Sequence, residues 1–91
     1  MSNRVVHFEI HAADPQRVMQ FYGDVFGWEF PEWMDDPPYW GVLTAPEGSE
    51  EPGINGGMMN RQGPDPSEGA AVNAFVCTVQ VDSYDRVHEK I

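Results

Sequence analysis

Three side chains that could bind a metal ion or move a proton alternate near the start of the chain: His7, Glu9 and His11. A spacing of two residues places them on one face of a β-strand. Imidazole and carboxylate groups on one strand face can approach a single divalent ion such as Zn²⁺, Mn²⁺, Fe²⁺ or Ni²⁺. Glu9 could also act as a general base, because burial raises the pKa of a carboxyl group.

The same strand face has a simpler interpretation, in which Glu9 and the two histidines hydrogen-bond to each other on the polar wall of a wet cavity. We favour this interpretation, because the sequence offers no second cluster of ligands to complete a metal site. A hydrolase triad has no support, since Ser49, Ser67 and Ser83 lie in predicted turns or caps without a histidine partner.

The elements that must position these side chains begin with a strand over 5–11, whose apolar members Val6, Phe8 and Ile10 point away from the polar three. A helix follows, because Asp14 can cap it and Pro15 fits its first turn. The helix is expected to end at Gly27, a residue type that adopts the left-handed conformation without strain.

The remaining pattern predicts further strands at 28–30, 39–44, 56–60 and 72–81, loops at 32–38 and 45–55, and a second helix capped by Asp82 or Ser83. Helices on one face of a mixed sheet make the predicted fold class α+β.

A repeat links the two strand-and-helix units of the chain. A shift of 69 positions aligns Phe8 with Cys77, Ile10 with Val79 and Val18 with Val87. Two full copies would need about 138 residues at this period, whereas the chain has 91. We therefore expect a first module over 1–60, a linker over 61–71, and the first strand and helix of a second module over 72–91.

Composition narrows the possible partners. The net charge of −10 argues against binding to nucleic acid and to anionic membranes, because both need clustered Lys and Arg. The single cysteine, Cys77, cannot form an internal disulfide, and the first residues lack the basic-then-apolar pattern of a signal peptide. A cytoplasmic location is expected.

Two stretches resemble the vicinal oxygen chelate superfamily, which includes glyoxalase I, bleomycin-resistance proteins and extradiol dioxygenases. They are the run Val6-His7-Phe8-Glu9-Ile10 and the run Phe21-Tyr22-Gly23-Asp24-Val25-Phe26-Gly27-Trp28. The resemblance implies βαβββ modules whose curved sheets surround a ligand cavity, and it places a first metal ligand at His7. The repeat then puts Val76 at the second ligand position, where no coordinating atom is available, and 56–60 offers no imidazole or carboxylate.

We therefore expect a small-molecule-binding domain without a complete metal site of its own and with no cofactor. Its expected partners are the small molecule and a second copy in a homodimer. The predicted ligand-binding residues are His7, Glu9, His11, Trp40, Met58, Thr78 and Gln80. The alternative is a divalent-metal-dependent lyase or dioxygenase, with Glu9 as its catalytic residue, His7 as a metal ligand and the remaining ligands supplied by another chain or by residues that this chain lacks.

Overall fold

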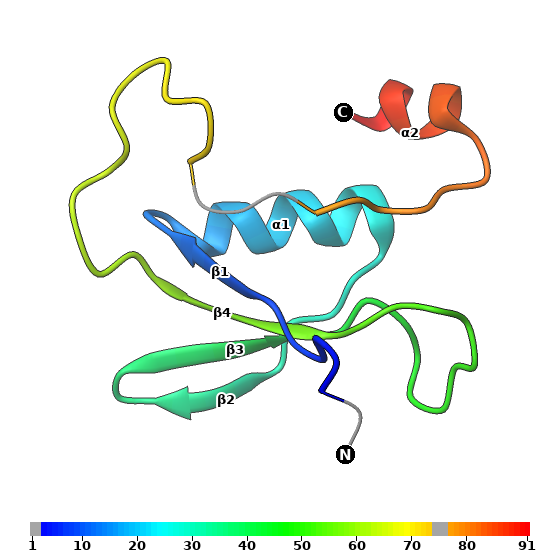
Figure 1. Cartoon of the computed structure of the whole chain (residues 1–91), viewed down its shortest axis with the longest axis horizontal. Coiled ribbons are helices and arrows are strands. Elements are labelled where there is room, and N and C mark those ends of the chain that lie inside the picture. Colours follow the sequence, from blue (N-terminus) through cyan, green and yellow to red (C-terminus); the bar gives the residue numbers. More distant parts are fainter. Residues whose placement is uncertain (1–2, 74–76) are drawn as a thin grey trace.

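The computed structural model describes residues 3–73 and 77–91, and it contains a sheet and two helices (Figure 1). The elements in chain order are β1 (Glu9–Ala12), α1 (Pro15–Phe26), β2 (Glu32–Asp35), β3 (Pro38–Val42), β4 (Gly56–Asn60) and α2 (Tyr84–Lys90). The fold is α+β, as predicted. Within the described ranges, neither helix has the length and apolar character needed to cross a membrane.

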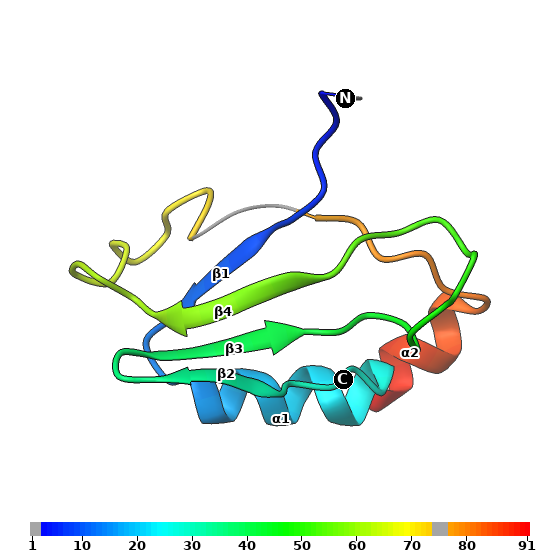
Figure 2. The same ribbon diagram turned by 90° about the horizontal axis from the view of Figure 1, so that it is seen from below.

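The sheet has four strands in the order β1-β4-β3-β2. β1 runs parallel to β4, whereas β4, β3 and β2 pair in antiparallel fashion. The helix α1 connects β1 to the antiparallel strands and lies along one side of the sheet (Figure 2). This arrangement is one βαβββ module, the unit that the sequence predicts for 1–60.

The ends of α1 form where the sequence predicts them. The Asp14 side chain accepts a hydrogen bond from the backbone N–H of Arg17 at 3.3 Å, and Pro15 occupies the first turn. Gly27 ends the helix in the left-handed conformation, with φ of 76°. A residue with a Cβ would be strained at this φ, so glycine is the natural stop signal.

The core is small and lies between the sheet and α1. Its buried members are Ile10, Ala12, Val42 and Met58, and Val42 and Met58 are fully buried. Half-buried side chains of α1 pack against this cluster, among them Tyr22, whose ring stacks on Trp28 with centroids 4.9 Å apart. With few fully buried side chains, the fold depends strongly on each of them.

Several predicted strand boundaries are wrong, including those of β3, which covers Pro38–Val42 rather than 39–44. β1 begins at Glu9 rather than at Val5, and 28–30 contributes only a single bridge between Glu29 and Leu43. The second strand instead covers Glu32–Asp35, which composition had assigned to a loop. β2 lies at the edge of the sheet with all four residues exposed, so its acidic side chains stay in water, where an edge strand tolerates charge.

The strand predicted at 72–81 is not observed in its described part. Residues 72–73 and 77–81 form no strand, and 74–76 lie outside the described residues. Alternating apolar residues favour an extended backbone, but a strand also requires a partner, which the pattern does not supply. The following helix α2 does form, with Ser83 as its cap, and it packs on α1 without burying any residue.

Replacing Met58 with alanine should lower the free energy of unfolding by about 2–5 kcal/mol, because Met58 is fully buried and the lost side chain leaves a cavity. Met34→Ala is the matched control: Met34 is 53% exposed on β2, and its loss should change stability by less than about 0.5 kcal/mol. Urea unfolding followed by circular dichroism measures both. Equal shifts of the two variants would contradict the assignment of the core.

Candidate functional site

The sheet presents a second face, opposite to α1, that carries polar and aromatic side chains. The strand register pairs Glu9 with Gly57 and His11 with Met59, and it pairs Met59 in turn with Tyr39. Residues paired across neighbouring strands point to the same side of a sheet. Glu9, His11 and Tyr39 therefore share this face, which we call the open face, because neither helix packs on it in the described part of the chain.

Four side chains on the open face form one hydrogen-bonded chain. The Tyr39 hydroxyl donates to Glu9 Oε2 at 2.9 Å, and His11 Nε2 lies 2.7 Å from the other carboxylate oxygen, Oε1. His7 Nε2 lies 3.2 Å from the Tyr39 oxygen. Because Tyr39 gives its proton to Glu9, its oxygen accepts from His7, which places the His7 proton on Nε2. The predicted network between Glu9 and His11 is confirmed, and His7 joins it through Tyr39.

A pair of facing glycines allows two aromatic rings to lie on the sheet. Gly41 of β3 pairs with Gly57 of β4, and Gly57 pairs with Glu9 of β1. A Cβ on Gly57 would overlap the Tyr39 hydroxyl, and a Cβ on Gly41 would overlap the indole ring of Trp33. The row of paired residues thus keeps its two central positions free of side chains, and the rings of Tyr39 and Trp33 occupy that space.

Trp33 reaches this row because of an irregularity in β2. The pairing of β2 with β3 shifts register between Glu32 and Met34, which is where Trp33 lies. A bulge of this kind redirects a side chain toward a chosen face. The Trp33 and Tyr39 ring planes are inclined by only 21°, with centroids 6.2 Å apart, and Trp33 is still 52% exposed.

The network sets the charges on the open face. The pKa of Glu9 lies below its ordinary value, chiefly because His11 and then Tyr39 hydrogen-bond to the carboxylate, and these effects outweigh burial. The pKa of Tyr39 is raised by burial, by its hydrogen bond to Glu9 and by the charge of Glu9. Glu9 is therefore a carboxylate and Tyr39 a neutral donor. The direction for Glu9 is opposite to the one expected for a general base activated by burial.

The described residues do not fit a metal site of their own. Within 3–73 and 77–91, no three His, Cys, Asp or Glu side chains converge in a way that could hold an ion. Both Glu9 oxygens are already hydrogen-bonded, one to Tyr39 and one to His11. Val76, the predicted second ligand position, lies outside the described residues. We derive no step through a metal from this site.

The structure separates the predicted ligand-binding residues into three places. His7, Glu9 and His11 come together on the open face. Trp40 and Met58 pair with each other on the opposite face, where Met58 is fully buried and Trp40 packs on the core.

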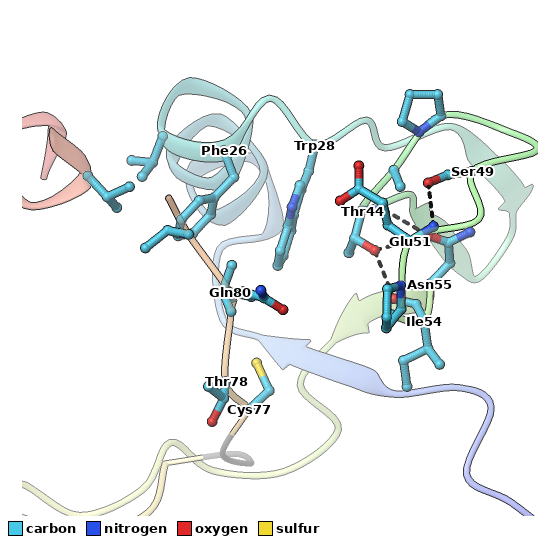
Figure 3. Close-up of a pocket in the computed structure, with 18 of the residues that line it drawn as sticks. Phe26, Trp28, Thr44, Ser49, Glu51, Ile54, Asn55, Cys77, Thr78 and Gln80 are labelled. Atoms are coloured by element: carbon cyan, nitrogen blue, oxygen red, sulfur yellow. Dashed lines mark hydrogen bonds between the residues drawn. The ribbon is translucent and has the colours of Figure 1, made fainter. Parts of the chain in front are cut away.

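Thr78 and Gln80 line a separate hollow of about 1240 Å³ beside Phe26 and Trp28 at the end of α1 (Figure 3). This hollow also contacts the loop after β3, in which Thr44 bonds to Asn55. Neither Thr78 nor Gln80 belongs to the hydrogen-bonded network on the open face.

The predicted ligand-binding residues include Trp40 but neither Tyr39 nor Trp33. Trp40 follows Tyr39 directly in β3, and a shift of one residue along a strand moves a side chain to the other face, so Trp40 lies on the core side. The signal that could have revealed Tyr39 is the glycine at position 57 of a predicted strand. A glycine inside a strand often marks the close approach of another group.

Removing the charge of Glu9 should lower the pKa of Tyr39. In Glu9→Gln the phenolate no longer faces a carboxylate, so Tyr39 should ionise at a lower pH, although burial still holds its pKa above the ordinary value of 10.0. Absorbance at the phenolate band during alkaline titration measures this, and Tyr39→Phe identifies which of the three tyrosines gives the transition. An unchanged midpoint would show that Tyr39 and Glu9 are not coupled.

A second variant tests the same contact without changing any charge. Gly57→Ala should displace the Tyr39 ring and lower the Tyr39 pKa in the same direction, since the new methyl group occupies the place of the hydroxyl. Gly63→Ala is the control, because nothing lies within 4 Å of a Cβ at that position.

Comparison with known proteins agrees with this module. Residues 4–44, which span β1 to the end of β3, match the family model described as bleomycin resistance protein-like N-terminal. A search of curated proteins gives no match. The matched segment contains the resemblance noted in the sequence, and the strand order and helix position are those of a partial module of that fold. This match supports a place for the chain in the glyoxalase/bleomycin-resistance, or vicinal oxygen chelate, superfamily.

Proposed function

We propose that this chain is a small-molecule-binding domain that receives its ligand on the open face of the sheet. One observation carries the proposal: Glu9 and His11 are joined in a hydrogen-bonded network, yet their side chains remain 40% and 41% exposed. Polar groups that serve only to stabilise a fold gain little at this exposure. A network held in one geometry and still open to solvent is suited to meeting a ligand.

Preorganisation supports this function. Glu9 is held on both oxygens and Tyr39 is held over Gly57, so neither side chain has to be ordered when a ligand arrives. Ordering a flexible side chain on binding costs about 0.5–1.5 kcal/mol. The network therefore lowers the entropic cost of recognition.

A metal-dependent lyase or dioxygenase is the second candidate. It is favoured by the common location of His7, Glu9 and His11 on one face. It would require Glu9 to exchange its bonds with Tyr39 and His11 for an ion, and it would require further ligands from another chain or from residues that this chain lacks. The binding function needs neither change.

The imidazole signals in proton NMR test the location of the site. Titration with fragments from a library of small polar and aromatic compounds should shift the Cε1–H signals of His7 and His11, because both belong to the open-face network. His88 lies on α2, stacked on Tyr84, and serves as an internal control that should not move. Fragments that shift only His88, or none of the three, would contradict the proposed site.

We also propose that two copies associate through the free edge of β1. In the described part of the chain, β1 pairs with β4 along one edge only, and the preceding Val5 and Val6 are 81% and 72% exposed. An unpaired strand edge next to apolar residues favours pairing with another chain. The lone Cys77 is consistent with a reducing location such as the cytoplasm.

Light scattering at micromolar concentration should give a mass of about twice the 10.2 kDa of one chain. Val6→Lys should shift the mass toward one chain, because it places a charge beside the free edge. Trp33→Lys, on the opposite edge strand, is the control and should leave the mass unchanged. A monomeric wild-type protein would contradict the association.

A further inference from the structure

The open face has two chemically distinct parts that lie side by side. One is a nearly flat aromatic floor, formed by Trp33 over Gly41 and Tyr39 over Gly57. The other is the anionic group of Glu9, which the Tyr39 hydroxyl contacts at 2.9 Å. We propose that this face binds a planar organic cation, an aromatic or heteroaromatic ring that carries a protonated amine or amidine. This inference rests on the proposed function and names its ligand class.

The shape of the floor selects a planar ligand. Atoms of the Trp33 indole occupy the place of a Cβ at Gly41, yet the residue is 52% exposed, so part of the indole is open to a ligand. The rings of Trp33 and Tyr39 are nearly parallel, inclined by 21°, so they do not surround a ligand as the walls of a cage do. Cages that recognise round quaternary ammonium groups surround the cation with several aromatic faces, whereas a flat floor offers its full area only to another flat ring.

The charge of the site selects a cation. Glu9 is kept ionised by its hydrogen bonds, and its one ion-pair partner among the described residues is His11. No Lys or Arg belongs to the network. Three further acids flank Trp33 along β2 and its turn: Glu32, Asp35 and Asp36. An anionic ligand would meet these charges with no fixed cation to balance them, while a cation is attracted both by Glu9 and by the face of an indole ring.

The spacing of the two parts sets the layout of the ligand. The Tyr39 ring lies between Trp33 and Glu9, since its ring contacts Trp33 and its hydroxyl bonds to Glu9. A ring that stacks on this floor therefore directs a substituent on its edge toward the carboxylate. Each carboxylate oxygen has a lone pair beyond the one already used, so Glu9 can accept further hydrogen bonds from an amine or amidine.

Four probes that differ in charge or in shape test the inference by isothermal titration calorimetry. They are naphthalene carboxamidine, its neutral carboxamide, the naphthoate anion and tetramethylammonium. The amidine should bind at least about tenfold more tightly than the amide, and its affinity should fall with added salt. Naphthoate and tetramethylammonium should bind at least about tenfold more weakly than the amidine, because one has the wrong charge and the other has no flat face.

Three variants test the contributions of the Trp33 ring and of the Glu9 charge to binding. Trp33→Ala and Glu9→Gln should each weaken binding of the amidine by about tenfold, whereas Trp33→Phe should restore part of the loss. Tyr84→Ala removes an aromatic ring that is 73% exposed and lies outside the site, and Glu68→Gln removes a charge in the linker; both are controls that should bind as the wild type does.

The outcomes separate this inference from the proposed function. Equal affinities for naphthoate and the amidine would contradict the preference for a cation. Equal affinities for tetramethylammonium and the amidine would contradict the preference for a planar ring. If none of the four probes binds while other fragments shift the His7 and His11 signals, the ligand class is wrong and the binding face stands. If no compound shifts those signals, both proposals fail.

Discussion

The hydrogen bond from Tyr39 to Glu9 joins two strands that are not neighbours. Tyr39 belongs to β3 and Glu9 to β1, and β4 lies between them in the sheet. The bond exists because Gly57, the residue of β4 that faces Glu9, has no side chain to obstruct the Tyr39 ring. The absence of one Cβ therefore permits the Tyr39–Glu9 hydrogen bond, which contributes to the pKa shifts of both groups, and it lets the Tyr39 oxygen meet His7.

The two faces of the sheet differ in character: one packs against α1 and forms the core, and the other carries the polar network. On one face α1 covers Ile10, Val42 and Met58 and supplies most of the hydrophobic stabilisation. Neither helix packs on the other face in the described part of the chain, so that face can hold a charged group and an exposed indole. In a small domain this division lowers stability, because each apolar side chain that stays in water contributes no burial to the core. Trp33 is such a side chain, since it is 52% exposed on the open face.

In the second unit, residues 72–91, the sequence pattern predicts the helix correctly but not the strand, because a strand needs a partner. Ser83 is sufficient to start α2, because a helix satisfies its backbone hydrogen bonds locally. The preceding extended stretch has the alternation of a strand, but its described residues do not pair. The repeat between Phe8 and Cys77 remains a prediction about duplication, and the β1 edge that no described strand pairs with is where a second sheet would continue.

Local signals in the sequence were sufficient for α1, β4 and the polar face of β1. Asp14, Gly27 and the alternation of His7, Glu9 and His11 act within a few residues, so they can be interpreted without a fold. The position of β2 and the roles of Tyr39 and Trp33 required the tertiary structure. Which aromatic ring lies on the open face depends on a bulge and on register across three strands, and register is settled by packing between segments that lie far apart in the chain.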